Sequence, residues 1–117
     1  MDVLPVTKIL ADSVAGPIYQ RLLTVLAALG PFQLEEKKTS IHVVRGRAFL
    51  GVHPRKNALL VNIVTAQPIV SDRVVRHDHV SANRVHNEVL LHAKADVDAE
   101  LVAWITQAYE LTERFRG

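Results

Sequence analysis

Histidines and basic residues are the side chains of this sequence that could bind an anion or a metal. Six Lys or Arg residues and no Asp or Glu lie between Lys37 and Ser71. The six histidines of the chain are His42, His53, His77, His79, His86 and His92. Arg and Lys pair with carboxylate and phosphate groups, and an imidazole titrates near neutral pH. The pattern predicts an anion site built from the middle of the chain.

A metal site is an alternative use of the histidines. His77-Asp78-His79 places two imidazoles on one side of an extended segment. A closed metal site needs about four ligands, and no recognised spacing such as HExxH is present. The sequence has no cysteine, which excludes thiolate ligands, disulfides and cysteine nucleophiles. We therefore expect no metal and no cofactor.

Two catalytic interpretations can also be weighed. Ser71, Asp72 and His77 are close in sequence, but no GxSxG elbow surrounds a serine to activate it. Glu36-x-Lys38 is typical of a metal-dependent nuclease strand, but that chemistry needs a second acidic ligand from an upstream strand. The sequence therefore favours binding over catalysis.

Two amphipathic helices frame the chain. In residues 16–29 the apolar residues share one helical face, and Gly30-Pro31 ends the segment. Asp96 is the expected N-cap of a second helix. Its apolar stripe consists of Val97, Leu101, Trp104, Ile105, Ala108, Leu111 and Phe115. Trp104 stands in the centre of this stripe, so we expect it to be buried.

The segments between the helices alternate in hydrophobicity, which predicts strands. They are residues 39–45, 47–53, 58–65 and 84–92, with 32–38 as a further edge strand. Short connections favour antiparallel pairing. We predict a single α+β domain over residues 1–117, with two layers. Its antiparallel sheet has about four to five strands, and the N- and C-terminal helices pack on one face.

The sheet face away from the helices is then uncovered, and we call it the open face. Its expected ligand-binding residues are Lys38, His42, Arg47, Phe49, His53, Asn62, Arg73, His86 and Glu88. Lys38, Arg47 and His86 have the chemistry to hold a carboxylate or phosphate. Arg73 lies in an 18-residue connection, 66–83, which we expect to fold as a long loop over this face.

Several short motifs stand in a defined order along the chain. They are Gly30-Pro31-Phe32, Glu36-Lys37-Lys38-Thr39-Ser40-Ile41, Arg47-x-Phe49, Ser71-Asp72-Arg73, Val80-Ser81-x-x-Arg84-Val85-His86-x-Glu88-Val89-x-Leu91 and Asp96-Val97-Asp98-Ala99-Glu100-Leu101-x-x-Trp104-Ile105. Together they resemble domain of unknown function 5655, over about residues 7–112. The resemblance implies a small α+β domain of bacteria or archaea without an established activity. It also implies a His-His pair where this chain has His86-Asn87.

The expected function is non-enzymatic recognition of a small anionic ligand on the basic, histidine-bearing open face. One alternative is a homodimer or other protein interface on the same face. A second alternative is weak nucleic-acid binding, with Phe49 as a stacking platform for a base. The chain shows no signal peptide and no apolar run of membrane-spanning length, so we expect a cytoplasmic protein without a membrane partner.

Overall fold

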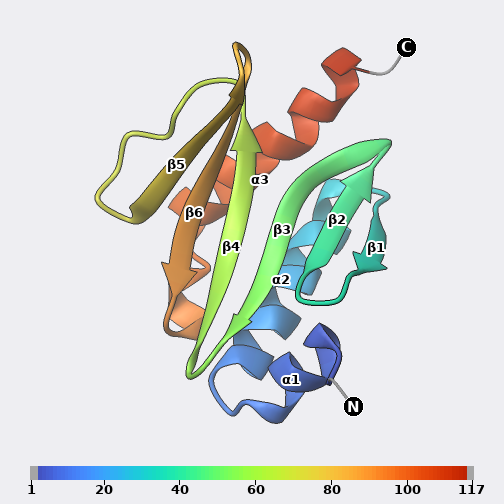
Figure 1. Cartoon of the computed structure of the whole chain (residues 1–117), viewed down its shortest axis with the longest axis vertical. Coiled ribbons are helices and arrows are strands. Elements are labelled where there is room, and N and C mark those ends of the chain that lie inside the picture. The colour runs from blue at the N-terminus through green and yellow to red at the C-terminus, as the bar shows by residue number, and fades with distance from the viewer. Residues whose placement is uncertain (1–2, 116–117) are drawn as a thin grey trace.

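A six-stranded antiparallel sheet forms one layer of the molecule, and the helices lie behind it in Figure 1. The computed structural model describes the backbone of residues 3–115 and the side chains of residues 3–113. The strands are β1 (Gln33–Glu36), β2 (Ile41–Arg45), β3 (Arg47–Arg55), β4 (Ala58–Thr65), β5 (Val74–Ser81) and β6 (Arg84–Leu91). Their order across the sheet is β1-β2-β3-β4-β6-β5. The helices are α1 (Pro5–Ala11), α2 (Ala15–Leu29) and α3 (Ala99–Leu111), with 3-10 turns at Lys94–Asp96 and Thr112–Phe115.

Side-chain hydrogen bonds and backbone geometry define the ends of the two long helices. Asp12 precedes α2, and its Oδ1 accepts the backbone N–H groups of Val14 and Ala15. Gly30 ends α2 with φ 142°, and a Cβ there would lie 2.5 Å from the Tyr109 hydroxyl oxygen, so only glycine fits. The N-cap of α3 is Asp98, whose carboxylate accepts the Leu101 N–H, and not Asp96 as predicted.

Asp96 has a different task, because it closes the turn before α3. Its Oδ2 accepts the backbone N–H groups of His92 and Ala93. Both aspartates therefore satisfy backbone donors, one on each side of Val97.

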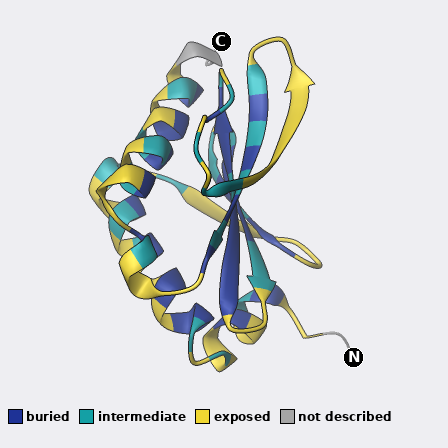
Figure 2. Ribbon diagram, turned by 90° about the vertical axis from the view of Figure 1, so that its left-hand side faces the viewer, coloured by how far each residue is buried: buried dark blue, intermediate teal, exposed yellow. Residues whose placement is uncertain are grey.

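The aliphatic faces of the strands form the core, as the alternation predicts. Figure 2 shows these buried residues between the sheet and the helices, while the outer surfaces of the helices are exposed. The buried strand residues include Ile41, Val43, Leu50, Val52, Leu59, Val61, Ile63, Val89 and Leu91. The two-layer α+β prediction is confirmed, with the N- and C-terminal helices on one face and one strand more than expected. The side chain of Phe115 lies outside the described residues.

The connection 66–83 is not a long loop over the open face. Residues 74–81 of this connection form β5, which pairs antiparallel with β6 at the edge of the sheet. All of β5 after Val74 is exposed, so the strand carries no apolar alternation that could have predicted it. Pairing with β6 forms it instead, a long-range effect.

Phe49 is also placed differently from the prediction. Val43 pairs with Leu50 and Val44 with Ala48, so Phe49 is the extra residue of a β-bulge in β3. The bulge breaks the strict alternation, and both Phe49 and Leu50 are buried in the core. The Phe49 ring meets the Tyr109 ring edge-on, with 5.4 Å between the centroids. The prediction that Phe49 lies on the open face is wrong.

Within the described part of the chain, none of the helices is long and apolar enough to cross a bilayer.

Candidate functional site

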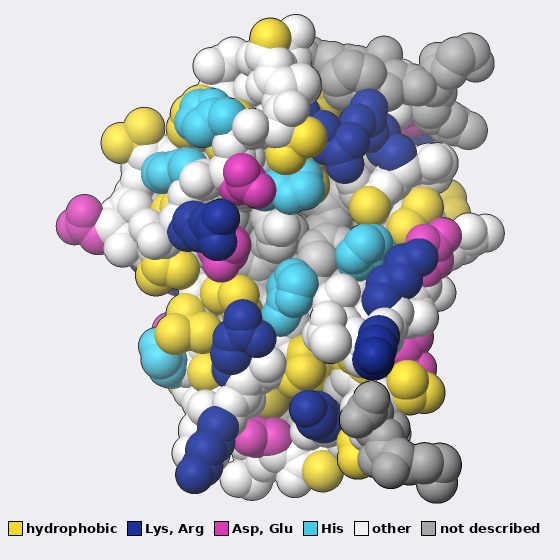
Figure 3. Space-filling model, viewed as in Figure 1, with side chains coloured by type: hydrophobic (Ala, Val, Ile, Leu, Met, Phe, Trp, Pro, Cys, Tyr) yellow, Lys and Arg dark blue, Asp and Glu magenta, His cyan; other side chains and the backbone are white. Residues whose placement is uncertain are grey.

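The open face carries a row of polar side chains across the sheet. The pairing register places His42, Gly51, Asn62, Glu88 and Arg76 side by side on five neighbouring strands. Figure 3 looks onto this face and shows histidine side chains gathered in its middle. The structure therefore brings together five of the predicted site residues, which are His42, His53, Asn62, His86 and Glu88.

Gly51 makes room for the side chains in the centre of the row. A Cβ at Gly51 would lie 3.4 Å from the Asn62 Cβ and 3.4 Å from His53 Nε2. These distances are at the short end of ordinary van der Waals contact, so a side chain longer than a methyl group at this position would meet Asn62 or His53. The glycine thus lets imidazole and amide groups pack directly over the β3 backbone.

Asn62 and His86 form a polar pair on neighbouring strands. The distance between Asn62 Nδ2 and His86 Nδ1 is 3.2 Å. Three polar atoms of this region are shielded from solvent and have no hydrogen-bond partner among the described residues: Asn62 Oδ1, His86 Nε2 and Arg84 Nε. All three side chains are nevertheless only partly buried, so the unpartnered atoms lie just beneath the surface of the face. Buried polar atoms without partners are rare, and a ligand or water is a common reason for them.

Arg84 and Arg47 approach each other where β3 and β4 diverge. Pairing between the two strands begins only at Leu50, so residues 47–49 of β3 are not paired with β4. A small cleft results, which reaches from the end of the sheet to the C-terminal end of α3. It is lined by Arg47, Ala48, Phe49, Val64 and Arg84 from the strands and by Ala108, Leu111 and Thr112 from the helix end. Burial lowers the pKa of Arg84, and the positive charge of Arg47 lowers it further. Like charges close together at a cleft favour an anion between them.

The histidines of the open face lie among charges of both signs. Burial lowers the pKa of His86, with a further decrease from Arg84, while Asp78 on β5 raises it. Burial likewise lowers the pKa of His53, with Arg55 adding to this effect and Glu88 opposing it. The basic, histidine-bearing face therefore also carries two carboxylates, the predicted Glu88 and, in addition, Asp78 on β5. Its positive end is the cleft at Arg84 and Arg47.

The predicted cluster of Lys38, Arg47 and His86 does not form a single site. Lys38 lies in the turn before β2, and Arg47 follows the turn after β2, so the length of this strand separates them. Arg47 lines the cleft, with Arg84 in place of Lys38, and His86 stands two residues after Arg84 on the same face of β6. Arg84 could have been found from the sequence, because it stands two residues before His86 and so shares its face of β6.

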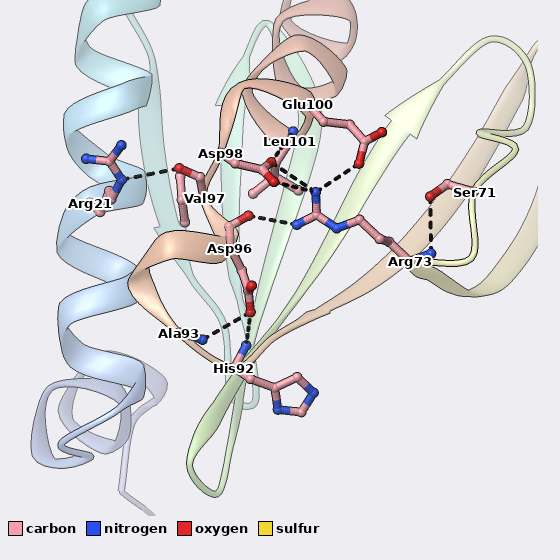
Figure 4. Close-up of polar contacts among 10 residues, drawn as sticks. All are labelled: Arg21, Ser71, Arg73, His92, Ala93, Asp96, Val97, Asp98, Glu100 and Leu101. Atoms are coloured by element: carbon pink, nitrogen blue, oxygen red, sulfur yellow. Dashed lines mark hydrogen bonds and ion pairs between the residues drawn. The ribbon is translucent and has the colours of Figure 1, made fainter.

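Arg73 does not reach the open face either. Figure 4 shows its guanidinium directed at the N-terminal end of α3. Nη1 donates to Asp98 Oδ1 at 2.9 Å and to Glu100 Oε1 at 3.0 Å, and Nη2 donates to the Asp96 carbonyl at 2.7 Å. The guanidinium also lies 5.5 Å from the centre of the Trp104 ring. Arg73 thus fastens the connection before β5 to α3, and the prediction that it binds ligand is corrected.

Asn87 is a buried polar residue that the sequence did not reveal as important. Its Oδ1 accepts the Ile69 N–H at 2.9 Å, and its Nδ2 donates to the Ile63 carbonyl and to Thr65 Oγ1, each at 2.8 Å. Asn87 is completely buried on the helix side of β6, opposite to His86. A histidine pair at positions 86 and 87 would therefore point to two different faces.

The described residues contain no group of three or more His, Asp or Glu side chains arranged to hold a metal ion. His77 and His79 belong to β5, where His77 Nε2 lies 2.8 Å from the Ile69 carbonyl oxygen.

The stability of the fold should fall as the pH decreases below about 6.5, the usual pKa of histidine. The pKa values of His53 and His86 are lower in the folded chain than in the unfolded chain. The unfolded chain therefore takes up protons first, and the free energy of unfolding decreases through this window. Above about pH 6.5 both histidines are neutral in the folded and unfolded chains, so their contribution to stability is fully present. Denaturant unfolding between pH 7.5 and 5 measures the effect.

The double variant His53→Gln and His86→Gln is the control for this pH dependence. Its unfolding free energy should change less with pH between 7.5 and 5 than that of the parent, because the two histidines with lowered pKa values are gone. An equal slope in parent and variant would show that other groups cause the dependence.

Comparison with known protein families gives one match that spans most of the chain. Residues 6–112 match the family model described as Domain of unknown function (DUF5655). Searches of curated proteins and of solved structures found no match.

Proposed function

Because the chain belongs to the DUF5655 family, whose description assigns no activity, we propose its function from the geometry of the open face. The domain binds a small anionic ligand, a carboxylate or a phosphate, at the end of the face where β3 and β4 diverge. Arg84 and His86 hold the anion, and Arg47 supplies further positive charge.

The observation that supports this proposal is the set of shielded, unpartnered atoms on one face. Asn62, Arg84 and His86 each present one such atom, and they come from neighbouring strands. A buried donor or acceptor without a partner costs about 1–3 kcal/mol, so three such atoms on one face need an explanation. A ligand that supplies the missing hydrogen bonds is a direct one.

The charges around these atoms favour an anion over a cation. Arg84 Nε is a permanent donor, and the positive charge of Arg47 lies close enough to lower the pKa of Arg84. An anion between the two guanidinium groups would reduce their repulsion and accept charge-assisted hydrogen bonds. The carboxylates of Asp78 and Glu88 share the face, opposite His86 and Asn62 in the strand register, so the positive charge is concentrated at Arg84 and Arg47.

The variant Arg84→Gln should weaken the binding of inorganic phosphate and of acetate by about tenfold to a hundredfold, the usual loss for a charged hydrogen bond. The measurement is a titration of each anion followed by amide NMR shifts or by calorimetry. The matched control is Arg55→Gln, because Arg55 lies at the other end of β3 from Arg47. Its affinities should match those of the parent.

Two results would overturn the anion site. One is a parent protein that binds neither phosphate nor acetate. The other is an Arg84→Gln variant with parental affinity for both anions.

The alternative functions lead to other outcomes. Homodimerisation through the open face would appear as a doubled mass in sedimentation. Nucleic-acid binding would appear as an affinity that falls steeply with salt. The burial of Phe49 removes the proposed stacking platform, which weakens the argument for nucleic acid.

A further inference from the structure

The Asn62–His86 pair has a property that does not depend on how its amide group is turned. If Asn62 donates to His86 Nδ1, then a neutral His86 carries its proton on Nε2, and the Asn62 oxygen is left outside the pair as an acceptor. If the amide is reversed, His86 Nδ1 donates, its Nε2 is an acceptor, and the Asn62 NH2 group is left outside the pair as a donor. In both arrangements the pair offers one donor and one acceptor.

The two atoms left outside this pair are the ones that lack partners. Asn62 Oδ1 and His86 Nε2 are both shielded from solvent and unpartnered among the described residues. A ligand that satisfies the pair must therefore bring an acceptor for one atom and a donor for the other. An anion without a proton can satisfy only half of the pair and leaves an acceptor facing its own lone pairs.

We propose that the Asn62–His86 pair makes the site selective for oxyanions that carry a hydroxyl group, such as hydrogen phosphate or a hydroxycarboxylate, over anions that carry none, such as sulfate. This selectivity rests on the proposed anion site. Arg84 Nε supplies the charge that both classes of anion need, and the Asn62–His86 pair distinguishes between them.

The neighbouring strands support the same preference. Asp78 on β5 lies opposite His86, and Glu88 lies opposite Asn62 in the strand register. Ionised carboxylates accept hydrogen bonds and donate none. They can therefore accept the proton of a ligand hydroxyl, while an anion without a hydroxyl group offers them no hydrogen bond. Because burial keeps the pKa of His86 low, the neutral pair is the form present at neutral pH.

Two matched pairs of probes test the selectivity at about pH 7.5, above the usual pKa of histidine. Phosphate and sulfate are tetrahedral anions of similar size, but only phosphate keeps a proton at this pH. Glycolate and acetate are carboxylates, but only glycolate has a hydroxyl group. Calorimetric titration of the full chain should show about tenfold or tighter binding for the hydroxyl-bearing member of at least one pair, the ratio expected when one buried group is left unsatisfied.

The variant Asn62→Leu has a similar side-chain shape but no polar atom. It should lower the affinity for phosphate or glycolate to that for sulfate or acetate, and leave the affinity for sulfate and acetate unchanged. A circular dichroism spectrum and a melting curve like those of the parent show that the variant is folded. Because the parent is tested with all four probes, the proposal stays testable if this variant does not fold.

The possible failures are distinguishable. Equal binding of both members in each pair by the parent would overturn the selectivity and leave the anion site standing. Selectivity that persists in Asn62→Leu would overturn the role of this pair. An absence of binding for all four anions would overturn the anion site and the selectivity together.

Discussion

Replacing Phe49 with alanine should lower the free energy of unfolding by about 3–5 kcal/mol, the usual cost of removing a buried aromatic ring. Phe49 is 1% exposed and fills the space between the β3 bulge and α3. The variant would leave a cavity against Tyr109 that the β-bulge keeps the backbone from closing. Equilibrium unfolding in denaturant at pH 7.5 gives the change directly.

Two further variants test whether the loss comes from the buried aromatic ring of Phe49. Phe49→Leu keeps most of the apolar volume and should cost less than Phe49→Ala. Trp104→Ala should also lower the free energy of unfolding by less than Phe49→Ala. Trp104 is only partly buried at the edge of the core, although its place in the apolar stripe predicts a buried, central residue. A Phe49→Ala variant that loses less than about 1 kcal/mol would show that the ring is not part of the core.

Replacing Asn87 with alanine should lower the free energy of unfolding by about 3 kcal/mol or more. The substitution removes the hydrogen bonds of Asn87 to the Ile69 N–H, the Ile63 carbonyl and Thr65 Oγ1 in a buried region, and among the described residues only Thr65 keeps a further side-chain bond, to the Gln67 carbonyl. Each buried group left without a partner costs about 1–3 kcal/mol. Because Ile69 belongs to the connection before β5, protease cleavage within residues 66–73 should also become faster.

Asn62→Ala is the matched control for Asn87→Ala. Asn62 is the same residue type on the neighbouring strand, but it lies on the open face and is only partly buried. Its side-chain hydrogen bond to His86 contributes about 1 kcal/mol or less to stability. Similar losses in both variants would contradict the assignment of Asn87 as a buried anchor.

The layered fold follows from local patterns that a sequence displays directly. Strand residues alternate between two faces, so Leu59, Val61 and Ile63 had to lie on the opposite side from Leu60 and Asn62. Covering the more aliphatic face with the two amphipathic helices left the histidines on the other face. The same alternation places His42, His53 and His86 together, because each stands out of phase with its apolar neighbours.

Two features lie beyond this kind of pattern. The bulge at Phe49 inserts one residue into the alternation, and a single inserted residue leaves no mark on composition or periodicity. Strand β5 is exposed along nearly its whole length, so no apolar face distinguishes it from a loop. Both depend on how β3 and β5 pair with strands elsewhere in the sheet.

The α+β class, the helix-covered core and the side of the sheet that carries the histidines can all be predicted from the sequence. The reason is that apolar side chains are buried at the period of the helix or strand that carries them. The tertiary structure alone decided which charges meet. Arg73 is paired with Asp98 and Glu100, which lie 25 and 27 residues away, while Arg84 meets Arg47 at the cleft between β3 and β4. The period of the backbone does not determine which charged side chains meet. Their partners depend on how distant elements pack, and the candidate site follows from that packing.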